Sequence, residues 1–124
     1  MVAFKNEVTQ DKQAGITLER EFYVMICIEE HQNIVNCINF IENVQTNEGP
    51  KNYLALKFAP NGVVLTYLNL RGKQDDKWIR FFLRQMIEGL LHIRNKDFCH
   101  LDVKCENMLL DADLNLMISD FGLA

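Results

Sequence analysis

The sequence has no hydrophobic run long enough to cross a membrane. Its longest apolar stretch, Phe22 to Ile28, is much shorter than the roughly 20 residues that a spanning helix needs. The first residues, Met1 to Lys12, mix polar and apolar types and do not form the charged-then-apolar pattern of a signal peptide. We therefore predict that the protein has no membrane partner and resides in the cytoplasm or the nucleus.

An excess of positive charge is also lacking. The formal net charge is −4, and a nucleic-acid binder needs a basic face to neutralise phosphates, so we predict no nucleic-acid partner.

The cysteines follow neither a disulfide pattern nor a zinc-ligand spacing, and we expect reduced thiols. Repeats and low-complexity tracts are missing, and 124 residues fit one domain at most. The cysteines are Cys27, Cys37, Cys99 and Cys105.

The most informative stretch lies near the end of the chain. The apolar run Met108 to Leu110, the acidic turn Asp111 to Asp113 and the run Leu114 to Ile118 predict a two-strand hairpin. A hairpin here would bring residues before it and after it close together in space.

Three oxygen-bearing side chains flank this hairpin. Asp102 and Asn107 precede it, and Asp120 follows it. Two carboxylates and an amide oxygen are hard ligands that suit Mg²⁺ and the phosphates it carries, and the nearby Lys104 could neutralise a transferring phosphoryl group. The pattern indicates a phosphate-handling site.

These residues also resemble a known family. The segment His100 to Asn107 reads His-Leu-Asp-Val-Lys-Cys-Glu-Asn, and Asp120 opens the sequence Asp-Phe-Gly. Both are similar to the catalytic loop and the magnesium-binding motif of eukaryotic protein kinases, and a lysine two residues after the aspartate is the pattern of serine/threonine kinases. The resemblance implies an enzyme that uses ATP and Mg²⁺ to phosphorylate a serine or threonine hydroxyl of a protein substrate.

The resemblance also implies roles for single residues. Asp102 would accept or orient the proton of the attacking hydroxyl, and Lys104 would stabilise the transferring phosphoryl group. Asn107 and Asp120 would hold Mg²⁺, while Leu109 would line the floor of the adenine pocket.

One alternative is a metal pair of His100 and Asp102, completed by Cys99 or Cys105. That spacing matches no zinc pattern and leaves Asn107 unexplained, so we read His100 as a packing and hydrogen-bonding residue.

Upstream, Val2 to Lys5 reads as a short strand that resembles the family's Val-Ala-x-Lys strand. The resemblance places Ala3 and Lys5 at the nucleotide, with Lys5 on the α- and β-phosphates. A helix is predicted from a Thr17 cap to about His31. Glu21 leaves from its apolar face, and by resemblance we pair it with Lys5, keeping Glu19 as the alternative.

Two strands, 37–44 and 53–58, and a linker, 59–62, are predicted next. The linker resembles the kinase hinge. On that alignment Leu56 gates the back of the adenine pocket, and the Lys57 carbonyl and the Ala59 amide bind adenine. Lys57 replaces the acidic residue usual at its position.

We expect a short helix over 63–70 and a long helix that begins after Asp75 or Asp76, with an apolar stripe at three- and four-residue spacing. The predicted fold is α+β, a partial two-lobed protein-kinase-like fold. Residues 1–58 would form a partial small lobe. Residues 59–124 would form the hinge and the start of the large lobe, through the catalytic loop and the Asp-Phe-Gly motif.

The pattern departs from the family in places. Leu101 stands where many kinases have an arginine that grips a phosphate on the activation loop, and a leucine cannot do so. We therefore expect activity that does not depend on a phosphate bound at this position.

The 124 residues include neither a glycine-rich loop before Lys5 nor an activation segment. We expect about half of a kinase domain, with an unpaired strand edge, bare apolar surface on the long helix and little or no stabilisation of the isolated chain by Mg-ATP. Two alternatives remain: a non-catalytic kinase-like binding module, or an inactive remnant. The sequence does not indicate an oligomeric state.

Overall fold

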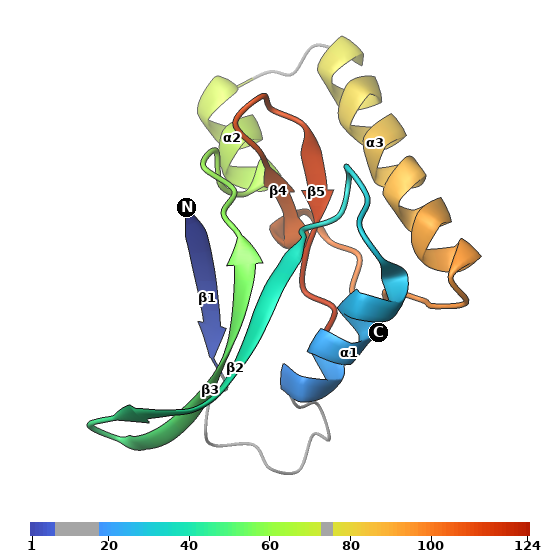
Figure 1. Ribbon diagram of the computed structural model, residues 1–124. Helices are drawn as coiled ribbons and strands as arrows, with labels where there is room; N and C mark the ends of the chain where they lie inside the picture. The colour runs from blue at the N-terminus through green and yellow to red at the C-terminus, as the bar shows by residue number, and fades with distance from the viewer. Residues whose placement is uncertain (7–17, 73–75) are drawn as a thin grey trace.

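The structure is a computed structural model that describes residues 1–6, 18–72 and 76–124. A sheet with one helix occupies one end of the molecule, and two helices with a small hairpin occupy the other (Figure 1). The predicted Thr17 cap and Asp75, one of the two residues after which the long helix was expected to begin, lie outside the described residues. The α+β prediction is confirmed: a partial small lobe precedes the start of a helical lobe.

The sheet contains three antiparallel strands in the order β1-β3-β2. β1 spans Val2–Asn6, β2 spans Cys37–Thr46 and β3 spans Gly49–Lys57. Within the described part of the chain β1 pairs with β3 alone, so it forms an edge of the sheet, as expected. The burial of β1 alternates, and Ala3 and Lys5 share the less exposed face.

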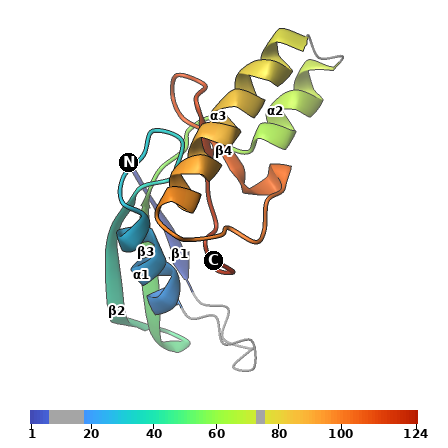
Figure 2. The same cartoon turned by 90° about the vertical axis from the view of Figure 1, so that its right-hand side faces the viewer.

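Helix α1, Leu18–Ile28, packs beside the sheet (Figure 2). Its buried residues recur at three- and four-residue spacing, and Glu21 lies among them. The helix ends three residues before the predicted His31, because Glu29 adopts a left-handed conformation with φ 64° that cannot continue the helix.

The second half begins with two helices. α2 spans Val64–Arg71, and α3 spans Asp76–Asn95. The stripe predicted on α3 faces the core, with Phe82 and Ile93 buried. A second apolar stripe on α3 stays exposed, as expected, and Ile79, Leu83, Ile87 and Leu91 are 41%, 46%, 52% and 48% exposed.

The predicted hairpin is present, with β4 over Met108–Leu110 and β5 over Leu116–Ile118. β5 starts two residues later than predicted, because Leu114 is left-handed at φ 64° and extends the turn. The β2–β3 turn is also tighter than expected: β2 runs to Thr46 and β3 starts at Gly49.

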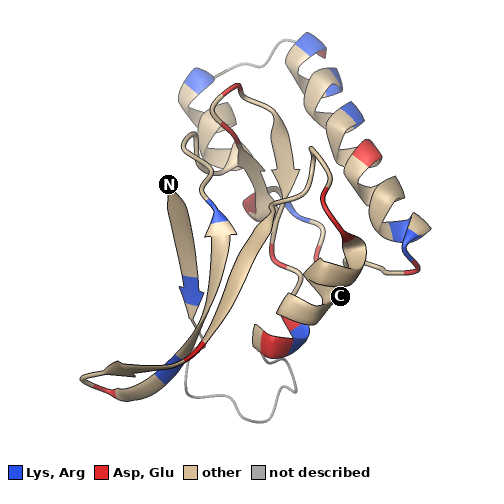
Figure 3. Cartoon of the chain, in the orientation of Figure 1, with Lys and Arg blue, Asp and Glu red and all other residues tan. Residues whose placement is uncertain are grey.

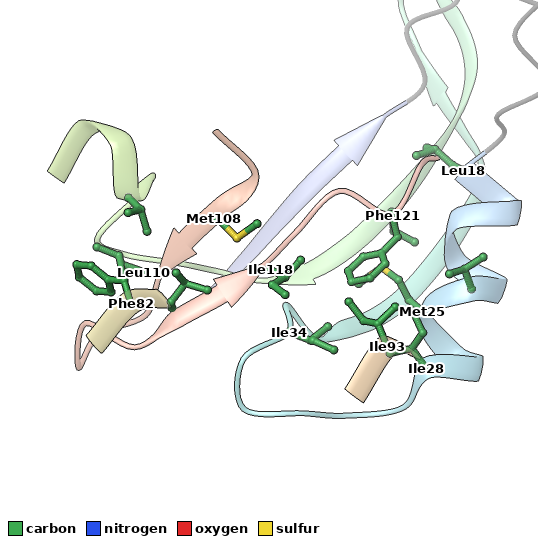
Figure 4. Close-up of a cluster of buried hydrophobic side chains, with 14 residues drawn as sticks. Leu18, Met25, Ile28, Ile34, Phe82, Ile93, Met108, Leu110, Ile118 and Phe121 are labelled. Carbon is green, nitrogen blue, oxygen red and sulfur yellow. The ribbon is translucent and has the colours of Figure 1, made fainter. Parts of the chain in front are cut away.

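One hydrophobic core joins the two ends of the molecule. It runs from Phe82 and Leu110 beside α3, past Ile118, to Phe121 and Met25 at α1 (Figure 4). The loop after α1 is tied into the hairpin, since the Val35 amide donates to the Ile118 carbonyl. The segment that carries Asp120 is therefore packed against both ends of the molecule. Among the described helices none combines the length and apolar character required to span a membrane.

Candidate active site

Lys5, near the end of β1, connects α1 to the segment that follows β5. Its Nζ donates to both carboxylate oxygens of Glu21, at 2.9 and 2.7 Å, and to Oδ1 of Asp120 at 2.9 Å. Glu21 is thus the partner of Lys5, whereas the alternative Glu19 is exposed. One ammonium group holds together three elements that are far apart in the sequence.

The charges of this cluster support one another. Burial opposes the charged form of Lys5, but the hydrogen bonds and charges of Glu21 and Asp120 outweigh burial and raise the pKa of Lys5 above its usual value. Burial likewise opposes ionisation of Asp120, yet the hydrogen bond and charge of Lys5 keep the pKa of that carboxyl below its ordinary value. Both groups are therefore charged at neutral pH.

Glu21 is buried, with a side chain only 3% exposed. A buried carboxylate needs several partners, and besides Lys5 it accepts a hydrogen bond from the Phe121 backbone amide, 3.1 Å from Oε1. The Asp-Phe-Gly segment is therefore bound directly by α1. Acidic and basic residues meet at the first turn of α1 in Figure 3.

The loop before the hairpin holds a second cluster around Asp102. Oδ2 of Asp102 accepts hydrogen bonds from Lys104 Nζ at 2.8 Å and from Asn107 Nδ2 at 2.9 Å. Asn107 Nδ2 also donates to the Asp102 carbonyl at 2.9 Å, which fixes the orientation of the amide. Asn107 is buried, so these bonds set the shape of the loop.

Lys104 and Asp102 also set each other's ionisation. The hydrogen bond from Lys104 is the main reason that the pKa of Asp102 lies below its ordinary value. The same bond raises the pKa of Lys104. An ionised carboxylate and a charged ammonium thus lie side by side at neutral pH.

His100 and Ser119 join the loop to the hairpin. His100 is buried, its Nε2 donates to the Ser119 carbonyl at 2.9 Å and its ring packs edge-on against Phe121. Ser119 donates to the Asn107 carbonyl from its amide and its hydroxyl. His100 is thus a packing residue, as predicted. Ser119 connects the cluster around Asp102 to the segment that carries Asp120.

The oxygen donors fit a magnesium ion that is shared with phosphates. Because both hydrogen bonds of Asn107 use Nδ2, its amide oxygen is the atom that can face a cation. Asp120 supplies a carboxylate, and Mg²⁺ is commonly held by one or two protein oxygens, substrate phosphates and water. Over the described ranges, no three His, Cys, Asp or Glu side chains gather into a site that could hold a metal on their own.

The residues predicted for the adenine end come from both sheets and from the linker that holds Ala59. Ala3 pairs with Leu56 across β1 and β3. Leu109 lies in β4, where it forms an isolated bridge with Val63 just after the linker. Lys57 is exposed, and its amide donates to the Asn36 carbonyl at 2.9 Å.

Ala59 accepts a hydrogen bond from the Gly62 amide at 3.2 Å. The roles predicted for the Lys57 carbonyl and the Ala59 amide stay predictions.

The sequence alone missed two groups of this site. Ser119 could have been noticed as a polar residue that lies between a buried strand and Asp120. The Phe121 amide carries no signal in the sequence, because every residue except proline has one. Cys99 and Cys105, weighed as alternative metal ligands, are exposed free thiols.

Comparisons with known proteins show the family of the chain. The family model described as "Protein kinase domain" matches residues 1–124, and the chain belongs to the protein kinase family. A relative in Saccharomyces cerevisiae, serine/threonine-protein kinase PKH3, is 32% identical over 120 residues, which cover 97% of this chain and 13% of that protein.

Two further relatives are kinases. Maternal embryonic leucine zipper kinase of Danio rerio is 32% identical over 122 residues, covering 94% of this chain and 17% of the relative. Serine/threonine-protein kinase cds1 of Schizosaccharomyces pombe is 29% identical over 116 residues, which cover 94% of this chain and 24% of that protein. The chain thus spans less than a quarter of the length of each of these relatives.

Proposed function

We propose that the protein containing this chain is a protein serine/threonine kinase, which transfers the γ-phosphoryl group of ATP to a hydroxyl group of a protein substrate. The observation that carries the proposal is the position of Lys5 between Glu21 and Asp120, at 2.7 and 2.9 Å. A lysine that is held by one buried carboxylate and one exposed carboxylate presents a fixed positive charge to phosphates at the edge of the sheet.

Phosphoryl transfer needs mainly positioning and charge stabilisation from the protein. Both bonds from Lys104 and Asn107 reach Oδ2 of Asp102, so we assign Oδ1 to the substrate hydroxyl. An ionised Asp102 would orient that hydroxyl and accept its proton. Lys104 would stabilise the negative charge on the transferring group.

Asn107 and Asp120 would hold Mg²⁺ through their side-chain oxygens. When bound, the ion supplies positive charge that offsets the charge of the ATP phosphates. Ala3, Leu56, Lys57, Ala59 and Leu109 would surround the adenine. We further propose that residues 1–58 and 59–124 belong to the two lobes of the domain, with the linker between them as the hinge.

The test is phosphoryl transfer by the full-length protein, measured with labelled ATP and casein as a generic substrate. We expect phosphoserine or phosphothreonine as product and, for Asp102→Asn, a loss of at least about 10²-fold in rate. The control Asp97→Asn makes the same chemical change at an exposed, left-handed position that asparagine tolerates. Equal rates for Asp102→Asn and wild type would refute the assignment, and phosphotyrosine would refute the serine/threonine class.

A further inference from the structure

The linker after β3 is hydrogen-bonded to β4, the first strand of the hairpin. The Leu110 amide donates to the Gly62 carbonyl at 2.8 Å, and the Asn61 amide donates to the Leu110 carbonyl at 3.3 Å. Val63 continues this pairing through its bridge to Leu109. The position of the linker is therefore set by the hairpin that follows the catalytic loop.

The Asn61 side chain extends this pairing into the β4–β5 turn. Its Nδ2 donates to the Asp111 carbonyl at 2.7 Å and makes a longer contact of 3.4 Å to the Ala112 carbonyl. The first bond has good geometry, and the second is weak. Because Asn61 is exposed, its side chain does not need these bonds to satisfy its polar groups. The effect of the bonds is to hold the linker in place.

The turn that receives these bonds is itself well fixed. Oδ1 of Asp111 accepts from the amides of Asp113 and Asn115, at 2.9 and 2.8 Å, and Oδ2 accepts from Asn115 Nδ2 at 3.1 Å. The Asp111 amide also donates to the Asn115 carbonyl at 3.0 Å. Asn61 thus connects the linker to a rigid turn.

We propose that Asn61 is a positioning residue for the adenine end of the nucleotide, an inference that rests on the proposed function. Ala59, assigned to adenine, lies two residues before Asn61, and Leu109, assigned to the floor, lies in the strand that Asn61 pairs with. Together with the backbone bonds between the linker and β4, the side-chain bond of Asn61 sets the spacing between these two groups. Preformed spacing reduces the ordering that binding would otherwise require.

The phosphate end is held by different residues. Lys5 and Asp120 are tied to Glu21, whereas the bonds described for the Asn61 side chain reach only Asp111 and Ala112. Removal of the Asn61 amide should therefore weaken the binding of adenine and leave the binding of the phosphates unchanged.

The experiment measures the dissociation constants of the full-length protein for Mg-ATP and for inorganic tripolyphosphate with Mg²⁺ by titration calorimetry. For Asn61→Ala we expect ATP binding to weaken about fivefold, the factor that corresponds to one ordinary hydrogen bond. Tripolyphosphate binding and kcat should stay unchanged while KM for ATP rises. Asn61→Asp, which replaces the donor by a carboxylate, should weaken ATP binding at least as much.

The matched control is Asn115→Ala, which removes one side-chain bond from the same turn, leaves the two amide bonds to Asp111 Oδ1 in place and does not touch the linker. It should leave both dissociation constants unchanged. Equal ATP affinity in Asn61→Ala and wild type, an equal loss for both ligands, or the same loss in Asn115→Ala would overturn the role of Asn61. If the wild type binds neither ligand, the proposed function itself fails.

Discussion

The Phe121 amide donates to Oε1 of Glu21 at 3.1 Å, across 100 positions of the sequence. This bond joins α1 to the Asp-Phe-Gly segment. Because the same carboxylate accepts from Lys5, the assembly of the candidate site and the stability of the fold depend on the same buried group.

The first prediction concerns this buried carboxylate. Lys5→Met removes the cation from Glu21, and an unpaired buried charge is costly, so we expect a loss of about 2 kcal/mol in the free energy of unfolding. Glu21→Gln should cost less, since a neutral amide oxygen can still accept from Phe121. Urea denaturation measures both. The double variant should recover part of the loss, and an additive loss would contradict the proposed coupling.

The second prediction concerns the pH dependence of stability. The pKa of Asp120 lies below its ordinary 3.8. Its contribution to the free energy of unfolding is therefore present above that value and is lost as pH falls through the lower folded-state pKa. The pKa of Lys5 lies above 10.5, so its contribution is present below 10.5 and is lost as pH rises through the folded-state value. Asp120→Asn should flatten the acid side of the stability profile, measured by thermal unfolding against pH. An unchanged acid side would count against the ion pair.

A third prediction follows from two stacked histidines. The rings of His31 and His92 lie 4.6 Å apart, and His31 Nδ1 accepts from the Asn33 amide at 3.0 Å. Burial, followed by the charge of His92, lowers the pKa of His31 below 6.5, although Glu88 opposes this. As pH falls, the unfolded chain therefore takes up a proton at His31 at a higher pH than the folded chain does. Stability falls as pH drops through 6.5 towards the folded-state pKa.

His31→Asn tests this explanation, because an asparagine oxygen can replace Nδ1 as the acceptor for the Asn33 amide but does not titrate. Stability of the variant should vary less between about pH 5 and 7 than stability of the wild type. The same slope in both proteins would show that another group titrates there.

A fourth prediction concerns the contact of α3 with β5. A Cβ at Gly89 would lie 2.7 Å from Ile118 Cδ1 and 3.0 Å from the Asn33 carbonyl oxygen, which is backbone and cannot move freely. Alanine favours a helix by about 1 kcal/mol over glycine. The overlap should nevertheless make Gly89→Ala destabilising by about 1–3 kcal/mol. Ile118→Val removes the Cδ1 contact and should restore part of the loss, while a more stable Gly89→Ala would contradict the packing.

Part of this structure could be predicted from the sequence. The hairpin and the long helix follow from periodicity and turn signals, the pairing of Lys5 with Glu21 was implied by the family resemblance, and each is present. The end of α1 and the start of β5 were wrong by a few residues. Both depend on left-handed residues, Glu29 and Leu114, whose types give no warning of that conformation.

The contacts that complete the site were less accessible to sequence reasoning. Asn61 was predicted only as part of the linker, because the partners of its side chain are backbone carbonyls about 50 positions away. The bond from the Phe121 amide to Glu21 likewise depends on tertiary packing. Long-range bonds to backbone groups leave no pattern of residue types to read.

The most direct test of the central claim, that Lys5, Asn107 and Asp120 form a magnesium-nucleotide site, is thermal unfolding of the full-length protein with and without Mg-ATP. At about a hundred times the dissociation constant, the nucleotide should stabilise the wild type by roughly 2.7 kcal/mol. The control Asp97→Asn should keep this stabilisation, and Asp120→Asn should lose most of it. Equal stabilisation of Asp120→Asn and wild type would contradict the claim.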